Sequence, residues 1–268
     1  MKEMPSSAVT FVHIEKTAGT STRQFIENAV GSEHVGIYHA TEDRISLSID
    51  RLHPTTDPTV DALINRLSHP SLSPLLSALS PLLGGVNRLR VLHKYPEFII
   101  PDGTRVIFGH FSADRFDKLI DRQIRAVVLR EPLERMTSHY DHWRRNRGVQ
   151  NWRVKIPYDA RLGFETFAFL PQLQNYQSQA LAGISLSDFD VAGTTENLAS
   201  FTERLANIFL EEEMCAESTN LDIALGKLNR THEKRAKPTI LKSDSFRNAF
   251  REFHSVDYDL YQEAVEIN

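Results

Sequence analysis

The chain has 268 residues, of which 41% are hydrophobic and 25% charged, and its formal net charge is −4. This composition is usual for a folded globular protein and argues against collagen-like, low-complexity and disordered classes. The negative average charge argues against a nucleic-acid partner, so an anion-binding site must come from a local cluster of cations. The single cysteine, Cys215, excludes an intramolecular disulfide and indicates a reducing compartment.

The sequence shows no pattern typical of a signal peptide or a membrane span. Residues 1–10 lack the apolar centre of a signal peptide, and the longest aliphatic runs, such as 126–129, are far shorter than the roughly 18 residues of a transmembrane helix. We therefore expect a cytoplasmic protein with no integral membrane segment.

The first 31 residues predict a strand, a loop and a helix. Residues 9–14 (VTFVHI) form the β-branched and aromatic run of a buried strand, and a polar loop, 15–20 (EKTAGT), follows it. Apolar residues then recur at helical spacing, with Thr20 or Ser21 as the N-cap and Gly31 placed to end the helix.

Two more strands are predicted at 105–108 (RVIF) and 125–129 (RAVVL). The second is followed by a helix with Pro132 in its first turn and Gly148 at its end. Strands that alternate with helices predict an α/β fold whose central sheet is mostly parallel and flanked by helices. Ligands bind such sheets at the carboxyl ends of the strands.

The rest of the chain is predicted to be mainly helical. From Phe164 onward we expect helices, with an amphipathic one at 198–209 and a final one at 246–264. We expect a single domain, 1–268, that carries an insertion at about 40–100. The Ser/Pro/Leu-rich centre of the insertion predicts short helices, which form either a lid or a structural cap.

The loop after the first strand combines groups that bind oxyanions. It has a lysine, small residues that let a ligand approach the backbone, hydroxyl groups and the start of a helix, whose N–H groups attract anions. A kinase-type P-loop reads GxxxxGK[ST], whereas here Lys16 precedes Gly19 and no glycine opens the loop. On spacing alone, an ordinary capped helix is an equal alternative. The candidate residues are Lys16, Thr17, Ala18, Gly19, Thr20 and Ser21.

A second cationic loop follows the strand at 125–129. Arg130 offers a planar fork for a phosphate, and Ser138 lies two helical turns further on. The alternative is a salt bridge from Arg130 to Glu131 or Glu134. Two anion sites at one sheet edge indicate one ligand with two phosphate-like ends.

Several segments resemble a known family. Residues 13–21 (HIEKTAGTS) and 129–140 (LREPLERMTSHY) resemble the two nucleotide-binding motifs of the carbohydrate sulfotransferases related to heparan sulfate 2-O-sulfotransferase, sulfotransferase family 2. The first is similar to that family's HIPKTAGTS loop, and the second to its RDPxxRxxS element. The resemblance spans most of the chain outside 40–100. Its further segments are 108–111 (FGHF), 191–198 (VAGTTENL), 228–231 (LNRT) and 257–261 (DYDLY).

The resemblance implies a P-loop-like sulfotransferase fold and a reaction that uses 3′-phosphoadenosine 5′-phosphosulfate (PAPS) and releases 3′-phosphoadenosine 5′-phosphate (PAP). The sulfuryl group would pass to a hydroxyl of a carbohydrate, a glycolipid or another acceptor, without a metal. The resemblance implies that Lys16 and the rest of its loop hold the phosphosulfate and that Arg130 and Ser138 hold the 3′-phosphate. It also implies that Asn229 and Thr231 lie near the nucleotide. Because Golgi members carry an anchor and usually disulfides, the chain looks more like a soluble bacterial-type relative.

The base that accepts the proton of the acceptor hydroxyl is predicted to be His110. It lies just after a predicted strand, beside Gly109, imidazole titrates near neutral pH, and the position matches the family's GH segment. A histidine that only makes a hydrogen bond in its loop is the alternative, and Glu15 and His13 are the other candidate bases. Glu15 stands where the family often has proline. His139 and His142 have a spacing that metal ligands use, but no further ligands accompany them.

Two other functions are consistent with parts of the pattern. One is an inactive nucleotide-binding or glycan-binding protein of the same fold, which the presence of Lys16, Arg130, Ser138 and His110 argues against. The other is a P-loop kinase. It is disfavoured by the position of Lys16 and because no carboxylate suited to hold magnesium follows a predicted strand.

Overall fold

The fold is seen in a computed structural model that describes residues 7–39, 44–48, 100–150, 155–215 and 238–267. All of these residues belong to one compact unit. The expected insertion at 40–100 falls almost entirely outside the described residues, as do Asn229 and Thr231. A single domain with a helical insertion therefore stays a prediction.

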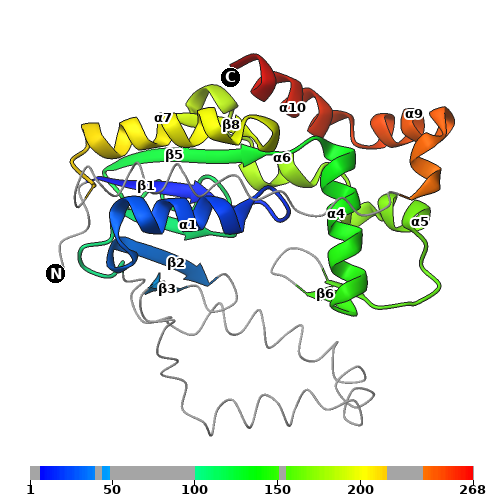
Figure 1. The fold of residues 1–268 in the computed structure, drawn as a ribbon, viewed down its shortest axis with the longest axis horizontal. Helices are drawn as coiled ribbons and strands as arrows, with labels where there is room; N and C mark the ends of the chain where they lie inside the picture. The colour runs from blue at the N-terminus through cyan, green and yellow to red at the C-terminus, as the bar shows by residue number, and fades with distance from the viewer. Residues whose placement is uncertain (1–6, 40–43, 49–99, 151–154, 216–237, 268) are drawn as a thin grey trace, which may run out of the picture. The chain divides into compact units, whose positions relative to one another are not determined.

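A six-stranded sheet forms the centre of the described part, in the order β3-β2-β4-β1-β5-β8 (Figure 1). All neighbouring strands are parallel except β2 and β3, which are antiparallel. The predicted α/β class with a mostly parallel sheet flanked by helices is thus confirmed. The strands are β1 (Ser7–Val12), β2 (Val35–His39), β3 (Arg44–Leu47), β4 (Val106–Gly109), β5 (Arg122–Leu129) and β8 (Val191–Thr194).

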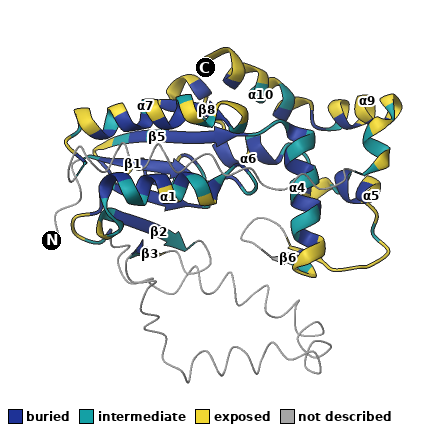
Figure 2. Cartoon of the chain, viewed as in Figure 1, coloured by how far each residue is buried: buried dark blue, intermediate teal, exposed yellow. Residues whose placement is uncertain are grey.

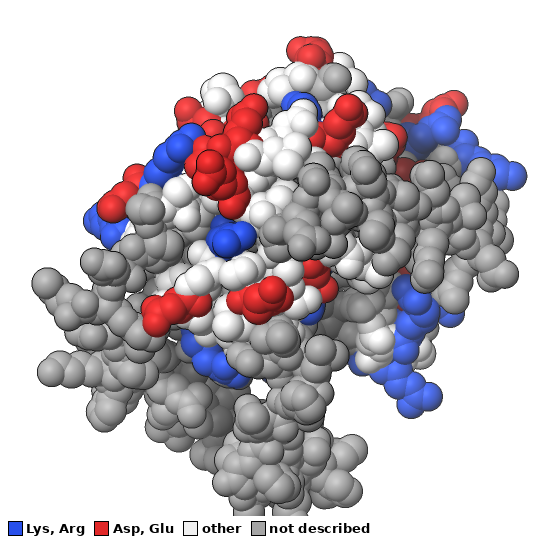
Figure 3. All heavy atoms as spheres, turned by 60° about the vertical axis from the view of Figure 1, so that its left-hand side comes forward, with Lys and Arg blue, Asp and Glu red and all other residues white. Residues whose placement is uncertain are grey.

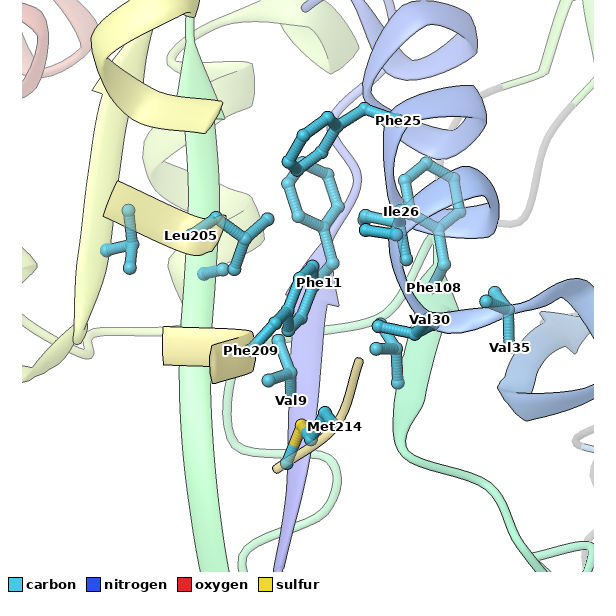
Figure 4. Packing of buried hydrophobic residues seen from close by; sticks show 14 of the residues in the cluster. Val9, Phe11, Phe25, Ile26, Val30, Val35, Phe108, Leu205, Phe209 and Met214 are labelled. Atoms are coloured by element: carbon cyan, nitrogen blue, oxygen red, sulfur yellow. The ribbon is translucent and has the colours of Figure 1, made fainter. Parts of the chain in front are cut away.

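Helices α1 (Gly19–Val30) and α7 (Leu198–Glu211) pack on one face of the sheet and close the main hydrophobic core (Figure 4). Within it, the ring of Phe11 stacks on Phe108 with centroids 4.9 Å apart and meets Phe201 edge-on at 6.0 Å. Burial of each such ring contributes roughly 1.5–3 kcal/mol. The sheet and the inner sides of these helices are buried (Figure 2). This core therefore fixes where β1, β4 and β5 end.

A second group of helices packs around the last strand and its neighbours. The C-terminal helix α10 contacts β8, α6 and α4, and α4 contacts α5. A short hairpin, β6 (Gly148–Gln150) with β7 (Lys155–Pro157), follows α4. The helices are α4 (Pro132–Arg145), α5 (Phe164–Ala168), α6 (Tyr176–Leu181), α9 (Asp244–Phe253) and α10 (Ser255–Ile267).

Both ends of the first loop differ from the prediction. Strand β1 ends at Val12, two residues earlier than expected. Helix α1 begins at Gly19, so neither Thr20 nor Ser21 is its N-cap. Ala18 takes that position in the left-handed region, with φ 63°, and no side chain caps the helix. The loop is therefore short and is shaped by its backbone.

The end of α4 is also different. The helix stops at Arg145, and Asn146 closes it through a backbone N–H bond to the carbonyl of His142 at 3.0 Å. Gly148 does not end the helix but begins β6, with φ 122°, a value that disfavours any side chain.

The sequence did not predict several short strands, because their residues show only a weak strand pattern. Strands β2 and β3 were not predicted, and β2 contains Gly36, whose Cβ would lie 2.6 Å from Ile45 Cγ2 of β3. Strand β8 lies in a region expected to be helical. The expected final helix is two helices that meet at His254, whose side chain bonds to Ala168 O at 3.0 Å and to Asn175 N at 3.3 Å.

The end of the sheet where the strands begin carries charges of both signs (Figure 3). Arg122, at the start of β5, pairs there with Glu212 at 2.6 Å. Among the described residues, no helix has the length and apolarity needed to cross a bilayer.

Candidate functional site

Three neighbouring strands end at the same edge of the sheet, and each is followed by a residue that the sequence marked as a candidate for the site. His13 follows β1, His110 follows β4 and Arg130 follows β5. The His13 N–H donates to the carbonyl of Gly109 at 2.8 Å, so β1 and β4 stay paired up to the first histidine. The parallel order thus brings together residues nearly 120 positions apart in the sequence.

The two histidines stack on each other at this edge. Their ring centroids lie 4.3 Å apart at an interplanar angle of 26°. Burial lowers the pKa of His13 well below its usual value, and the nearby His110 and Lys16 lower it further. His13 is therefore neutral at neutral pH.

His110 has the hydrogen-bond pattern of a general base. Its Nδ1 lies 2.7 Å from the backbone oxygen of His13, which can only accept, so Nδ1 carries the proton. The lone pair of the neutral ring is then on Nε2. The side chain is 34% exposed, which gives a substrate access to it. This geometry favours the base assignment over a histidine that only makes a loop hydrogen bond.

The Lys16 loop has an unusual backbone. Lys16 and Ala18 both have positive φ, at 74° and 63°, and such strain in residues other than glycine concentrates at ligand-binding sites. The Thr17 hydroxyl donates to Ile14 O at 2.9 Å and so braces the loop from inside. The first intrahelical bond of α1 runs from Thr22 N to Ala18 O at 3.0 Å. The N–H groups of residues 19–21 precede it and have no intrahelical acceptor.

Gly19 is needed where the loop meets the stacked histidines. A Cβ at this position would lie 1.8 Å from His13 Nε2, well inside any allowed contact. We expect Gly19→Ala to displace the His13 ring, lower the free energy of unfolding by about 1–3 kcal/mol and weaken anion binding. Urea unfolding and calorimetry would measure both.

Gly163→Ala is the matched control for this substitution. No atom lies within 4 Å of a Cβ at Gly163, and its φ of −73° suits any residue. If Gly19→Ala is as stable as Gly163→Ala and binds anions equally well, the close approach of the loop to His13 is not required.

Arg130 is held in place through its backbone by Gln177 of α6. The Gln177 amide accepts from Arg130 N at 2.9 Å and donates to Arg130 O at 2.8 Å. Asp257 of α10 holds α6 in turn, because its carboxylate accepts from Gln177 N at 3.0 Å and from Ser178 N at 2.8 Å. Both Gln177 and Asp257 are buried. A chain of hydrogen bonds therefore runs from the C-terminal helix to the second cationic loop.

The Arg130 guanidinium connects the two loops. Nη1 donates to the backbone oxygen of Lys16 at 3.3 Å. Of the two expected alternative partners, Glu131 and Glu134, Glu134 lies 3.9 Å from Nη2, and the side chains of Arg130 and Glu134 are partly exposed. An ion pair at this distance and exposure contributes little free energy, so it does not prevent the guanidinium from binding a ligand.

Positive charge concentrates around Lys16. Burial lowers the pKa of Lys16, the guanidinium groups of Arg145 and Arg130 lower it further, and the carboxylate of Glu15 opposes them. Arg145 lies on α4 seven residues after Ser138, and this spacing puts the half-buried Ser138 on the helix face that turns toward Lys16. Lys16 and Arg130, from the two loops, thus lie at one edge, and the place of Ser138 beside them stays a prediction.

The two histidines of α4, His139 and His142, have the spacing that metal ligands use. His139 is buried against the rings of Phe167 and Tyr176, with centroids at 5.7 and 6.0 Å. Within the described ranges, no three His, Cys, Asp or Glu side chains are placed to hold a metal ion.

Three residues of the site were not assigned a role from the sequence: Tyr176, Gln177 and Asp257. Asp257 begins the DYDLY segment, so the resemblance marked the region without giving its role. Tyr176 and Gln177 carry no recognisable local signal, because their partners lie far away in the sequence.

Comparisons with known proteins give a structural similarity only. No protein-family model matches the chain, and no curated protein does. A crystal structure of retinol dehydratase in complex with androsterone and the inactive cofactor PAP is 12% identical, with a TM-score of 0.39 over 99% of this chain and 82% of that chain. A crystal structure of retinol dehydratase with retinol and PAP is 12% identical, with a TM-score of 0.42 over 96% and 82%.

Proposed function

We propose that the chain is a sulfotransferase that moves a sulfuryl group from PAPS to the hydroxyl of a carbohydrate, a glycolipid or a similar acceptor. The observation that carries this proposal is the convergence of three strand ends, which places a histidine with a free Nε2 lone pair beside two cationic loops. PAP is also the nucleotide in the two retinol dehydratase structures. A cytoplasmic location is part of the proposal.

The residues of the site suit the two anionic ends of this nucleotide. Lys16 and the N–H groups that begin α1 would hold the phosphosulfate, because a cation and a helix start both stabilise oxyanions. Arg130 and Ser138 would hold the 3′-phosphate. Asn229 and Thr231, which lie outside the described residues, are proposed as further nucleotide contacts.

PAPS supplies the sulfuryl group in this scheme. His110 Nε2 takes the proton of the acceptor hydroxyl, and the acceptor oxygen forms its bond to sulfur on the side opposite the departing phosphate. As the bond between sulfur and the bridging oxygen breaks, its electron pair goes to the phosphate of PAP. Lys16 stabilises the charge that develops there. No metal takes part in these steps.

A thermal-shift panel of PAP, AMP, ATP and ADP, each with and without magnesium, tests the nucleotide assignment. A ligand at 100 times its Kd stabilises the folded state by about 2.7 kcal/mol. We expect PAP to stabilise the protein to this extent in the absence of metal, which raises the melting temperature. AMP, which lacks the 3′-phosphate, should raise the melting temperature much less.

Two results would redirect the assignment. Magnesium-dependent stabilisation by ATP would favour the kinase. Stabilisation by PAP without transfer of radiolabelled sulfate to glycan, lipid or phenol acceptors would favour an inactive binding protein.

A further inference from the structure

Glu15 lies between His110 and a buried tyrosine. Its Oε2 accepts a hydrogen bond from the Tyr176 hydroxyl at 2.7 Å. Its Oε1 lies 3.6 Å from His110 Nδ1, and the Glu15 side chain is only 16% exposed. The carboxylate is thus held at one oxygen and faces the imidazole with the other.

Tyr176 is itself rigidly placed. Its side chain is fully buried, and the guanidinium of Arg135 lies 4.7 Å from its ring centroid. Tyr176 is the first residue of α6, whose next two N–H groups are bound by Asp257. Packing and helix capping therefore aim the phenol hydroxyl at Glu15.

The side of the imidazole that Glu15 approaches decides its role. Glu15 faces Nδ1, which already donates to His13 O at 2.7 Å, and not Nε2, which is the nitrogen that would take a proton. Glu15 is therefore placed to act on the charge of the ring. With its carboxylate bonded to Tyr176, it is poorly placed to be the base itself.

The charges around His110 make such a partner necessary. A base that gains a proton becomes positive, and this edge already holds Lys16 and Arg130, with Arg135 of α4 behind Tyr176. His13, stacked on the ring from β1, is neutral. Asp257 opposes the charge of Arg135 and Glu134 lies 3.9 Å from Arg130, whereas Glu15 is the carboxylate that lies 3.6 Å from His110 itself. At 3.6 Å in a partly buried site, its attraction is only moderately screened.

We propose that Glu15 and Tyr176 are positioning residues for His110: the tyrosine hydroxyl fixes the carboxylate beside Nδ1, where its charge stabilises the imidazolium formed during transfer. This inference rests on the proposed function. It also separates Glu15, as the partner, from His110, as the base.

The kinetic test is Glu15→Gln, which keeps the shape of the side chain and removes its charge. We expect kcat for sulfate transfer to fall about 10- to 100-fold, with KM for the acceptor changed by less than about twofold and no increase in the Kd for PAP, because the carboxylate that opposes Lys16 is removed. Tyr176→Phe leaves the charge of Glu15 in place and removes the hydroxyl group that fixes its carboxylate. We therefore expect a smaller loss of kcat, about 3- to 10-fold. Glu212→Gln, which breaks an ion pair at the other end of the sheet, is the matched control and should leave kcat unchanged.

A spectroscopic test needs no substrate. In ¹⁵N-labelled wild-type protein, the neutral His110 ring should carry its proton on Nδ1, and at a fixed mildly acidic pH Glu15→Gln should reduce the share of His110 that carries two ring protons. An unchanged share overturns the pairing, as does an unchanged kcat in both variants. If the wild type transfers no sulfate, the proposed function fails, whereas the NMR comparison still decides whether Glu15 acts on His110. Should Glu15→Gln not fold, Tyr176→Phe is compared with the wild type, and the share of doubly protonated His110 should fall by a smaller amount because the carboxylate keeps its charge but loses its fixed position.

Discussion

Replacing His110 with alanine is expected to lower kcat for sulfate transfer about 10²- to 10⁴-fold, the usual contribution of a positioned general base. The Kd for PAP should change by less than about twofold, because the contacts that His110 loses are with His13 and Glu15 and not with the residues assigned to PAP. Stopped-time assays with radiolabelled PAPS give kcat, and calorimetry gives the Kd.

The control for this variant is His34→Ala. His34 bonds to Gly103 O at 2.8 Å in an exposed turn, and it makes no contact with the stacked histidines. Turnover close to the wild-type value in His110→Ala would remove His110 from the base role. Loss of PAP binding in the same variant would mean that the ring supports the loops and not the chemistry.

Arg130→Ala and Lys16→Ala are expected to weaken PAP binding about 10- to 150-fold each, since a hydrogen bond to a charged group is worth about 1.5–3 kcal/mol. The two variants should differ in selectivity. Arg130→Ala should bind PAP and AMP with similar affinity, because the guanidinium is assigned to the 3′-phosphate, whereas Lys16→Ala should bind both more weakly. Calorimetric titration at fixed salt measures all four values.

Two further variants make this experiment specific. Arg130→Lys keeps the charge but loses the planar fork, so its affinity for PAP should lie between those of the wild type and the alanine variant. Arg122→Ala removes an exposed guanidinium at the other end of the sheet and should have no effect. Unchanged affinity in both loop variants would contradict the nucleotide assignment.

The order of elements around the two loops was predictable because it depends on local patterns. Short continuous runs of apolar residues mark β1, β4 and β5, and helical spacing marks α1, α4 and α7. Parallel pairing then requires the loops after β1 and β5 to meet at one edge. The convergence of Lys16 and Arg130 followed from these local signals alone.

The contacts that hold the site together were not predictable, because they join residues distant in sequence. Tyr176 lies 161 positions from Glu15, and Gln177 lies 47 from Arg130. Neither residue type is diagnostic of such a role. The short strand β8 was not predicted for another reason. Its four residues, two of them Ala192 and Gly193, are too few and too small to show the pattern of a strand.

The hydrogen bonds of Asp257 have a consequence for the order in which the chain is made. Residue Arg130 leaves the ribosome long before Asp257, yet its backbone is clamped by Gln177, and Gln177 is held by that aspartate. The strands of the sheet are already synthesised when the last helix is still missing. During translation, the sheet can therefore assemble first, and the second cationic loop reaches its final geometry only when α10 docks.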